Sequence, residues 1–150
     1  SNLRYGKSDA TDAELYEALE TAQARSFVDA MGGLDAEISQ GGTNVSGGQR
    51  QRLAIARALV KKPKIYLFDD SFSALDYLTD VALRTALRQK TADSTFIVVA
   101  QRISTIRDAE KIVVLDEGRV VGVGRHEELF ETCDTYREIV LSQLTEDEAA

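Results

Sequence analysis

The chain has 150 residues, which is enough for a domain with a real hydrophobic core. Its 43% hydrophobic and 29% charged residues are ordinary for a globular protein, and its net charge of −7 excludes a broadly basic, nucleic-acid-coating surface. No apolar stretch approaches the roughly 20 residues that a membrane-spanning helix needs. The single cysteine, Cys133, excludes an internal disulfide.

The first 60 residues predict mainly helix. Thr11 and Glu14 have the spacing of a capping box, in which each side chain satisfies the backbone N–H of the other residue. Apolar residues then recur at helical spacing and predict one buried face, formed by Leu15, Leu19 and Ala22.

A second capping box opens the next predicted helix, with Ser46 at its start and Gln49 three residues later. Gly47 and Gly48 lie between them, and their bare backbone allows another group to approach closely. Because a helix start carries exposed N–H donors and partial positive charge, we expect an anion there, and phosphate first. A glycine-rich loop without a ligand is the structural alternative. The helix is predicted to end near Val60, with a packing stripe of Leu53, Ala56, Leu59 and Val60, and with Arg50, Arg52 and Arg57 on a solvated face.

A continuous apolar run at residues 65–68 follows Pro63, the only proline in the chain. Such a run predicts a strand that is buried on both faces of a parallel sheet. Asp69 and Asp70 come directly after it, at the sheet edge where α/β proteins bind ligands. Asp69 is a candidate magnesium ligand, and Asp70 is a candidate for orienting or deprotonating a water. A solvated pair of turn aspartates is the alternative.

The rest of the chain alternates between strand and helix, which favours an α/β fold with a largely parallel sheet. The predicted elements are a helix at 77–89, a strand at 95–100, a short helix at 102–107, two strands at 111–116 and 119–123 joined by a tight turn at 117–118, and helices near 126–131 and 134–144.

Together these motifs resemble the nucleotide-binding domain of an ABC transporter, most closely of the exporter type. The segments that carry the resemblance are the signature at 45–49, a Walker B-like strand at 65–70, a D-loop at 73–76, a switch segment at 98–106, and closing segments at 114–120 and 124–129. The resemblance covers nearly the whole chain in the family's order. It implies part of a P-loop NTPase-like (RecA-like) parallel sheet and an ABC-type helical subdomain, with ATP and Mg²⁺ as cofactors.

The phosphate cradle of that family, G-x-x-x-x-G-K-[ST], occurs nowhere in the 150 residues. We therefore expect an incomplete domain that lacks the Walker A strand and the N-terminal β-subdomain. Residues 1–60 would be the helical subdomain, and residues 61–150 the C-terminal part of the catalytic α/β core. By itself this chain is expected to bind ATP weakly or not at all, and to leave apolar faces unpaired.

Two positions depart from the family pattern. Asp70 stands where the catalytic glutamate is usual, and Gln101 stands where the switch histidine is usual. Aspartate is one methylene shorter, and glutamine cannot carry positive charge or relay a proton. Both changes together resemble the degenerate site of heterodimeric multidrug exporters. His126 is not a substitute for the switch histidine, because it begins a later predicted helix.

The signature, by contrast, is intact. In ABC dimers the signature of one subunit closes over the ATP of the other, so the resemblance implies that Ser46, Gly47, Gly48, Gln49 and Asp76 serve a partner's nucleotide. Asp76 is equally plausible as the N-cap of the helix at 77–89.

The resemblance also implies a setting. The partners are a second nucleotide-binding domain, in a heterodimer, and a transmembrane domain of the same exporter, without nucleic acid. The location is the cytoplasmic face of the cell membrane. A non-hydrolysing regulatory or dimerisation module and a soluble ABC-type ATPase of DNA repair or translation are the alternatives.

Overall fold

The computed structural model describes residues 2–147 of the chain, which divides into two compact units, Ser1–Val99 and Ala100–Ala150. Each unit has its own cluster of buried hydrophobic residues. The predicted boundary near residue 60, between a helical subdomain and a catalytic core, comes from the family resemblance and not from compactness. It stays a prediction. Among residues 2–147, no helix combines the length and the apolarity that crossing a bilayer requires.

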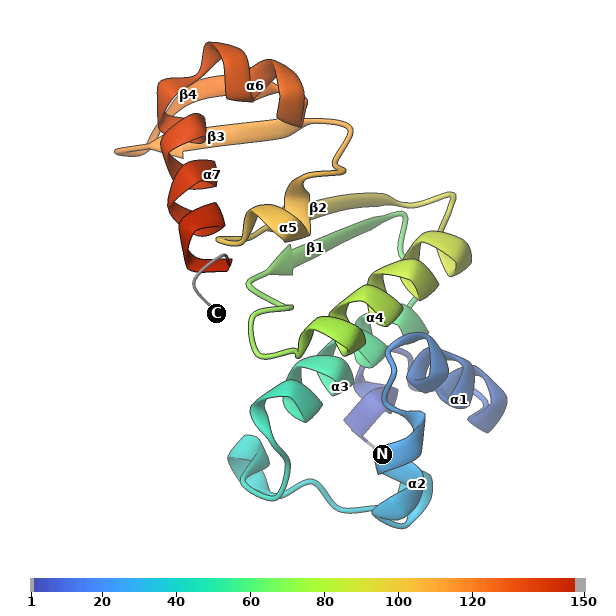
Figure 1. Cartoon of the computed structure of the whole chain (residues 1–150). Helices are drawn as coiled ribbons and strands as arrows, with labels where there is room; N and C mark the ends of the chain where they lie inside the picture. The colour runs from blue at the N-terminus through green and yellow to red at the C-terminus, as the bar shows by residue number, and fades with distance from the viewer. Residues whose placement is uncertain (1, 148–150) are drawn as a thin grey trace. The chain divides into compact units, whose positions relative to one another are not determined.

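The first unit is mostly helical and contains one small parallel sheet (Figure 1). Its elements, in chain order, are η1 (Asn2–Tyr5), α1 (Asp12–Thr21), α2 (Arg25–Ala30), η2 (Gly33–Asp35), η3 (Gln40–Gly42), α3 (Gly47–Val60), β1 (Ile65–Asp69), α4 (Tyr77–Lys90) and β2 (Thr95–Val99). The prediction of mainly helical structure before residue 60 is confirmed, and so is the end of the signature helix at Val60.

Local capping chemistry determines where the long helices of this unit begin. The capping box predicted at Thr11 and Glu14 is present at the start of α1, and the one predicted at Ser46 and Gln49 is present at the start of α3. On α1, the predicted apolar face is confirmed, since Leu15, Leu19 and the following Ala22 are fully buried. On α3, the stripe also includes Ile55, while Leu53 packs at its margin.

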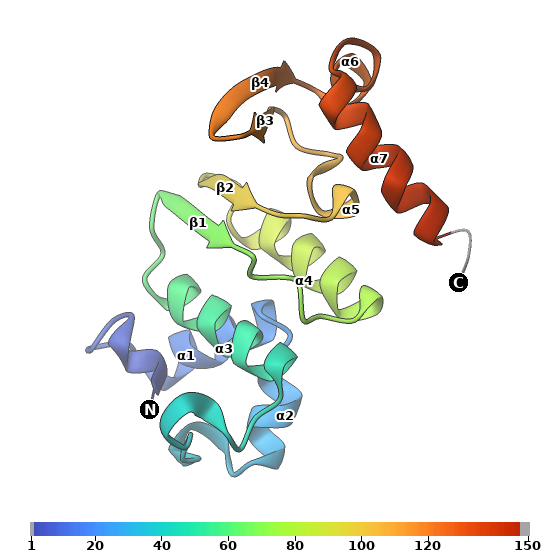
Figure 2. The ribbon, with the colours of Figure 1, turned by 90° about the vertical axis from the view of Figure 1, so that its left-hand side faces the viewer.

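Strands β1 and β2 pair in parallel, with Ile65 opposite Thr95 and Asp69 opposite Val99. Tyr66, Phe68 and Phe96 stack their rings on one face of this pair. Helices α3 and α4 lie on that same face (Figure 2), and the aromatic rings join their buried leucines in the core.

The prediction that the 65–68 strand is buried on both faces is wrong for this unit. Side chains alternate along a strand, and only the Tyr66 and Phe68 side is covered. On the other side, Ile65 and Leu67 of β1 are 61% and 68% exposed, and Ile97 and Val99 of β2 are 51% and 53% exposed. The described residues of the first unit therefore leave one apolar sheet face uncovered, as expected for an incomplete domain.

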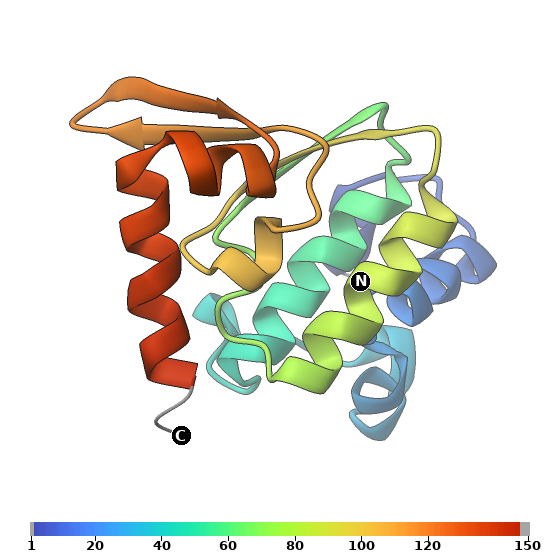
Figure 3. The ribbon, with the colours of Figure 1, turned by 45° about the horizontal axis from the view of Figure 1, so that its top comes forward.

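The second unit is a β-hairpin with helices packed on it, seen in orange and red in Figure 3. Its elements are α5 (Ile103–Ile106), β3 (Ile112–Asp116), β4 (Arg119–Gly124), α6 (His126–Thr132) and α7 (Asp134–Asp147). The predicted tight turn is confirmed, because Glu117 and Gly118 both have positive φ, at 46° and 76°. Two successive positive φ values are typical of the type I′ turn that matches the twist of a hairpin.

Glu14 gives the first unit a defined response to acid. Its carboxylate accepts from Lys7 Nζ at 2.8 Å and from the Thr11 N–H at 2.9 Å, and these bonds, the lysine's first, lower its pKa from 4.5 to about 2. Since the pKa is lower in the folded state, the contribution of Glu14 to stability is present above about pH 4.5 and is lost as the pH falls towards about 2.

We therefore expect Glu14→Gln to flatten the dependence of unfolding free energy on pH across that window. The measurement is urea denaturation at a series of pH values. Glu131→Gln, which changes an exposed carboxylate on α6, is the control. An unchanged pH slope in Glu14→Gln would contradict this assignment.

Candidate functional site

The turn that opens α3 presents free backbone donors at the protein surface. Ser46 Oγ accepts from the Gln49 N–H at 3.2 Å, and Gln49 Oε1 accepts from the Ser46 N–H at 2.8 Å. The Gly47 and Gly48 N–H groups have no acceptor within residues 2–147. Ser46 is exposed, and both glycines are half-exposed. The turn is thus pre-formed and open to an incoming anion.

Two arginine side chains of α3 bond to backbone carbonyls in the loops around this helix. Arg50 Nη1 donates to the carbonyl oxygens of Gly42 and Val45 at 3.1 and 3.0 Å. Arg52 Nη1 donates to the Gln23 carbonyl at 2.6 Å. Arg50 is exposed, as predicted, and Arg52 is half-buried; both also bond to carbonyls that the loops around α3 leave for a guanidinium.

The requirement for glycine at position 48 comes from the chain itself. A Cβ on Gly48 would lie 2.9 Å from the carbonyl oxygen of Ala74, whereas one on Gly47 would lie 3.6 Å from the Ala74 Cβ. The group that approaches the Gly48 backbone closely is thus the segment after β1, while the N–H groups of the turn remain available. The close approach to Gly48 in this structure is internal, and the approach of an anion to the two glycines stays a prediction.

Asp69 and Asp70 lie at the carboxyl end of β1, as predicted. The Asp70 N–H donates to the Val99 carbonyl at 3.1 Å, which holds this edge of the sheet together. Asp70 has a φ of 48°, a left-handed conformation that costs on the order of 1–3 kcal/mol and clusters at functional sites. Aspartate enters this region more readily than most residues, so the backbone itself favours the shorter acid at this position.

The predicted role of Asp69 is compatible with a magnesium ion that takes its other ligands from phosphate and water. Asp69 and Asp70 are both exposed, and neither carboxylate makes a hydrogen bond or ion pair within residues 2–147. In the described part of the chain, no three Asp, Glu, His or Cys side chains gather closely enough to hold a metal unaided. Mg²⁺ in phosphate-transfer sites is usually held by one or two carboxylates and by the substrate.

Asp76 acts as the N-cap of α4. Its carboxylate accepts from the Thr79 N–H at 3.0 Å and from the Thr79 hydroxyl at 2.7 Å. The backbone bond first, and then the hydroxyl bond, lower the pKa of Asp76 below its usual value. The predicted role of Asp76 as an N-cap is therefore confirmed. Its carboxylate is charged, and the residue is exposed at the end of the segment that joins β1 to α4.

Gln101 belongs to the second unit and follows Val99, the partner of Asp69 in the sheet, by two residues. Its side chain is exposed, while its carbonyl accepts from Gln143 Nε2 at 2.7 Å. Gln143 Oε1 accepts from the Ile103 N–H at 2.8 Å. One amide on α7 thus holds the backbone of the predicted switch residue, a role that no sequence pattern indicated.

A second glutamine, which the sequence analysis also missed, joins the signature helix to the end of β1. Gln51 Nε2 donates to the Asp70 carbonyl and to Ser73 Oγ, both at 3.0 Å. Its Oε1 accepts from the Ala74 N–H at 3.0 Å. One side chain of α3 is therefore bonded to the backbone of Asp70 and to residues 73 and 74 of the predicted D-loop.

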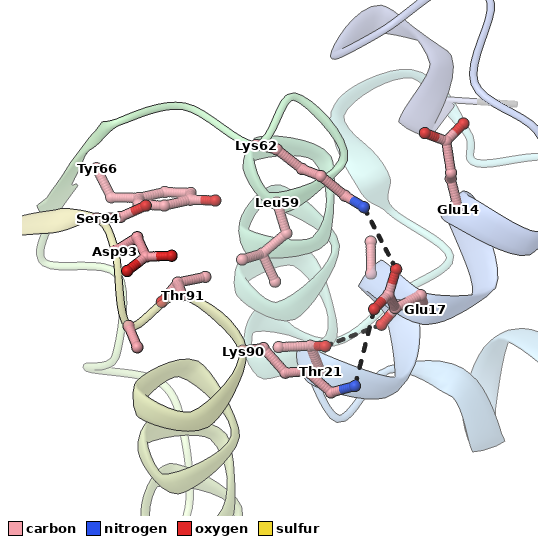
Figure 4. Close-up of a pocket in the computed structure, with 12 residues that line it drawn as sticks. Glu14, Glu17, Thr21, Leu59, Lys62, Tyr66, Lys90, Thr91, Asp93 and Ser94 are labelled. Carbon is pink, nitrogen blue, oxygen red and sulfur yellow. Dashed lines mark hydrogen bonds and ion pairs between the residues drawn. The ribbon is translucent and has the colours of Figure 1, made fainter.

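A cleft of about 190 Å³ in the first unit lies away from this site, beside the ends of α3 and α4 and the start of β2. Figure 4 shows Glu17 between Lys62 and Lys90, with ion-pair distances of 3.5 and 3.7 Å. Since Glu17 offsets the charge of both lysines, the cleft is a poor candidate for binding phosphate.

His126 is accounted for structurally, as the sequence analysis expected. It is the first residue of α6, and its Nδ1 lies 2.9 Å from the hydroxyl of Tyr136, which is buried. It belongs to the packing of α6 on α7.

Comparison with known proteins gives this geometry a family. The model of the ABC transporter family matches residues 3–73. The chain is 51% identical over 145 residues to an uncharacterized ABC transporter ATP-binding protein of Mycobacterium tuberculosis, and the match covers 95% of this chain and 25% of that protein. It is 43% identical over 142 residues to a beta-(1→2)glucan export ATP-binding/permease protein of Bradyrhizobium diazoefficiens, covering 95% of this chain and 24% of that protein.

A solved structure of a bacterial Atm1-family ABC exporter with ATP bound aligns with a TM-score of 0.90 at 38% identity. That alignment covers 95% of this chain and 25% of the exporter chain. The chain thus spans about a quarter of the length of these relatives. It belongs to the ABC transporter family, as a part of an ATP-binding domain with the fold of the exporter type.

Proposed function

We propose that this chain is part of the ATP-hydrolysing motor domain of an ABC exporter, which drives transport through a transmembrane domain. The observation that carries the proposal is the open, pre-formed turn at Ser46, on a helix that Gln51 joins to the backbone of Asp70 at the end of β1. The relatives named for export support the same activity. The proposed setting is the cytoplasmic face of the cell membrane.

The signature turn completes the ATP site of a second nucleotide-binding domain. Two N–H donors and the dipole of a helix of 14 residues stabilise negative charge on a phosphate that approaches from outside. Asp76 faces the same nucleotide region while it caps α4. The exposed position of Ser46 supports docking against another subunit, and we propose a heterodimer.

The chain's own site is weakened. Asp69 would hold Mg²⁺, which would neutralise charge on the phosphate, and Asp70 orients the attacking water with a side chain that is one methylene shorter than that of glutamate. Gln101 donates a hydrogen bond to a phosphate oxygen but cannot carry the charge of a histidine. By itself the chain binds ATP weakly, because the phosphate cradle is absent from its sequence.

Reversing both departures tests this proposal. In the full-length exporter with its partner, we expect Asp70→Glu combined with Gln101→His to raise ATP turnover by more than about tenfold over the original site, since misplacement of a reacting group by about 1 Å can cost a hundredfold. The measurement is phosphate release with the catalytic site of the partner disabled. Asp93→Glu adds the same methylene far from β1's carboxyl end and serves as the control.

A non-hydrolysing module is the second candidate, and the same two departures favour it. In that case the double variant would show no gain in turnover although it still binds ATP. A relative from Pongo abelii, at 42% identity, is named a mitochondrial potassium channel ATP-binding subunit, and a name for a channel subunit supports this second candidate.

A further inference from the structure

The segment between β1 and α4, residues 70–76, has no regular secondary structure, so its backbone groups need partners from elsewhere. Gln51 supplies two of them with a single side chain, through the Asp70 carbonyl and the Ala74 N–H. Ser73 adds a third link, because its Oγ accepts from Gln51 and donates to the Asp70 carbonyl at 3.1 Å.

The same segment also rests directly on the first turn of α3. The Ala74 carbonyl oxygen lies only 2.9 Å from the position that a Cβ on Gly48 would take, so the segment packs closely against the backbone of the signature. Phe72 and Leu75 anchor the segment in the core, with 6% of each residue exposed. The segment therefore has a fixed position relative to the signature turn, and Gln51 of α3 bonds to it through both the nitrogen and the oxygen of its side-chain amide.

We propose that Gln51 is a positioning residue that holds the signature turn and the Asp70 segment as one rigid body. This inference rests on the proposed function, in which the turn at Ser46 serves the nucleotide of the partner and Asp70 serves the chain's own. A displacement of the turn on engaging the partner's phosphate is then transmitted to Asp70 through the side-chain amide. The two nucleotide sites of the dimer are coupled inside this subunit.

The test uses Gln51→Met in the full-length exporter with its partner. Methionine has the same length and fills the same space but removes all three hydrogen bonds. We expect kcat for ATP to fall by about tenfold or more, because the signature turn is no longer held in place against the Asp70 segment. KM should change by less than about twofold. Ser73→Ala removes one link and is expected to lower kcat by about threefold. Gln89→Met, on the exposed side of α4, is the matched control and should leave kcat unchanged.

A second readout separates coupling from a local effect on the signature. If Gln51 links the two sites, the gain in turnover from Asp70→Glu with Gln101→His is lost in the Gln51→Met background. Retention of the full gain, or an unchanged kcat in Gln51→Met, overturns the inference. Ser46→Arg, assayed in parallel, reports on the proposed function alone: if it abolishes turnover while Gln51→Met does not, only the coupling role fails.

Discussion

Ser46→Arg is expected to lower the ATP turnover of the assembled dimer by on the order of a hundredfold or more. This is the usual effect of removing or misplacing one hydrogen-bond donor that stabilises an anion in the transition state. Arginine cannot accept from the Gln49 N–H as Ser46 Oγ does. Its long side chain also occupies the space in front of the Gly47 and Gly48 N–H groups. The measurement is steady-state phosphate release by the full-length exporter with its partner.

The control for this variant is an equivalent cap elsewhere in the same unit. Thr11→Arg removes the capping box of α1, whose Thr11 Oγ1 accepts from the Glu14 N–H at 3.3 Å. Both variants should lose about 1 kcal/mol of stability, the usual effect of deleting a cap. Only Ser46→Arg should lose turnover. Full activity in Ser46→Arg would show that the signature turn does not serve a nucleotide.

Phe68→Ala is expected to have the largest effect on stability, a loss of about 3–5 kcal/mol, as for other buried phenylalanines. Phe68 is 3% exposed, and its ring centroid lies 5.7 Å from that of Phe96 and 5.2 Å from that of Phe72. Its removal opens a cavity where β1, β2 and the segment that carries Asp70 meet. The measurement is urea denaturation of the chain followed by circular dichroism.

Leu67 provides the matched comparison on the other face of the same strand. It is 68% exposed, so Leu67→Ala in the chain alone should change the free energy of unfolding by less than about 0.5 kcal/mol. In a complete domain, in which we propose that a further layer covers this face, the same change should cost several times more. A large loss in the chain alone would show that the face is already buried.

The sequence predicts most of the local structure because the signals are local. Capping boxes, apolar spacing and the glutamate–glycine turn each involve residues a few positions apart, and the structure confirms the helix starts at Asp12 and Gly47 and the hairpin turn. The order of strands and helices after residue 61 follows the predicted alternation. The family resemblance adds the identity of the motifs, which local physics alone does not supply.

What escaped prediction depends on contacts between distant residues. Gln51 and Asp70 are 19 positions apart, and Gln143 and Gln101 are 42 apart, so neither bridge has a periodicity or motif to reveal it. The error on β1 is of the same kind. An apolar run indicates that both faces are suited to burial, but whether a second layer exists depends on residues outside the run. Similarly, the arginines of α3 find their acceptors in loops that only the folded chain brings near.

The uncovered side of the β1–β2 pair has a consequence for handling the chain by itself. Within the described residues, each strand pairs only with the other, so the outer backbone groups of both strands lack a sheet neighbour. A bare strand edge next to exposed aliphatic side chains is a template on which another copy can add its own strand. Expression of this chain by itself therefore favours self-association at high concentration, and the further layer that we propose for the complete domain would remove that tendency.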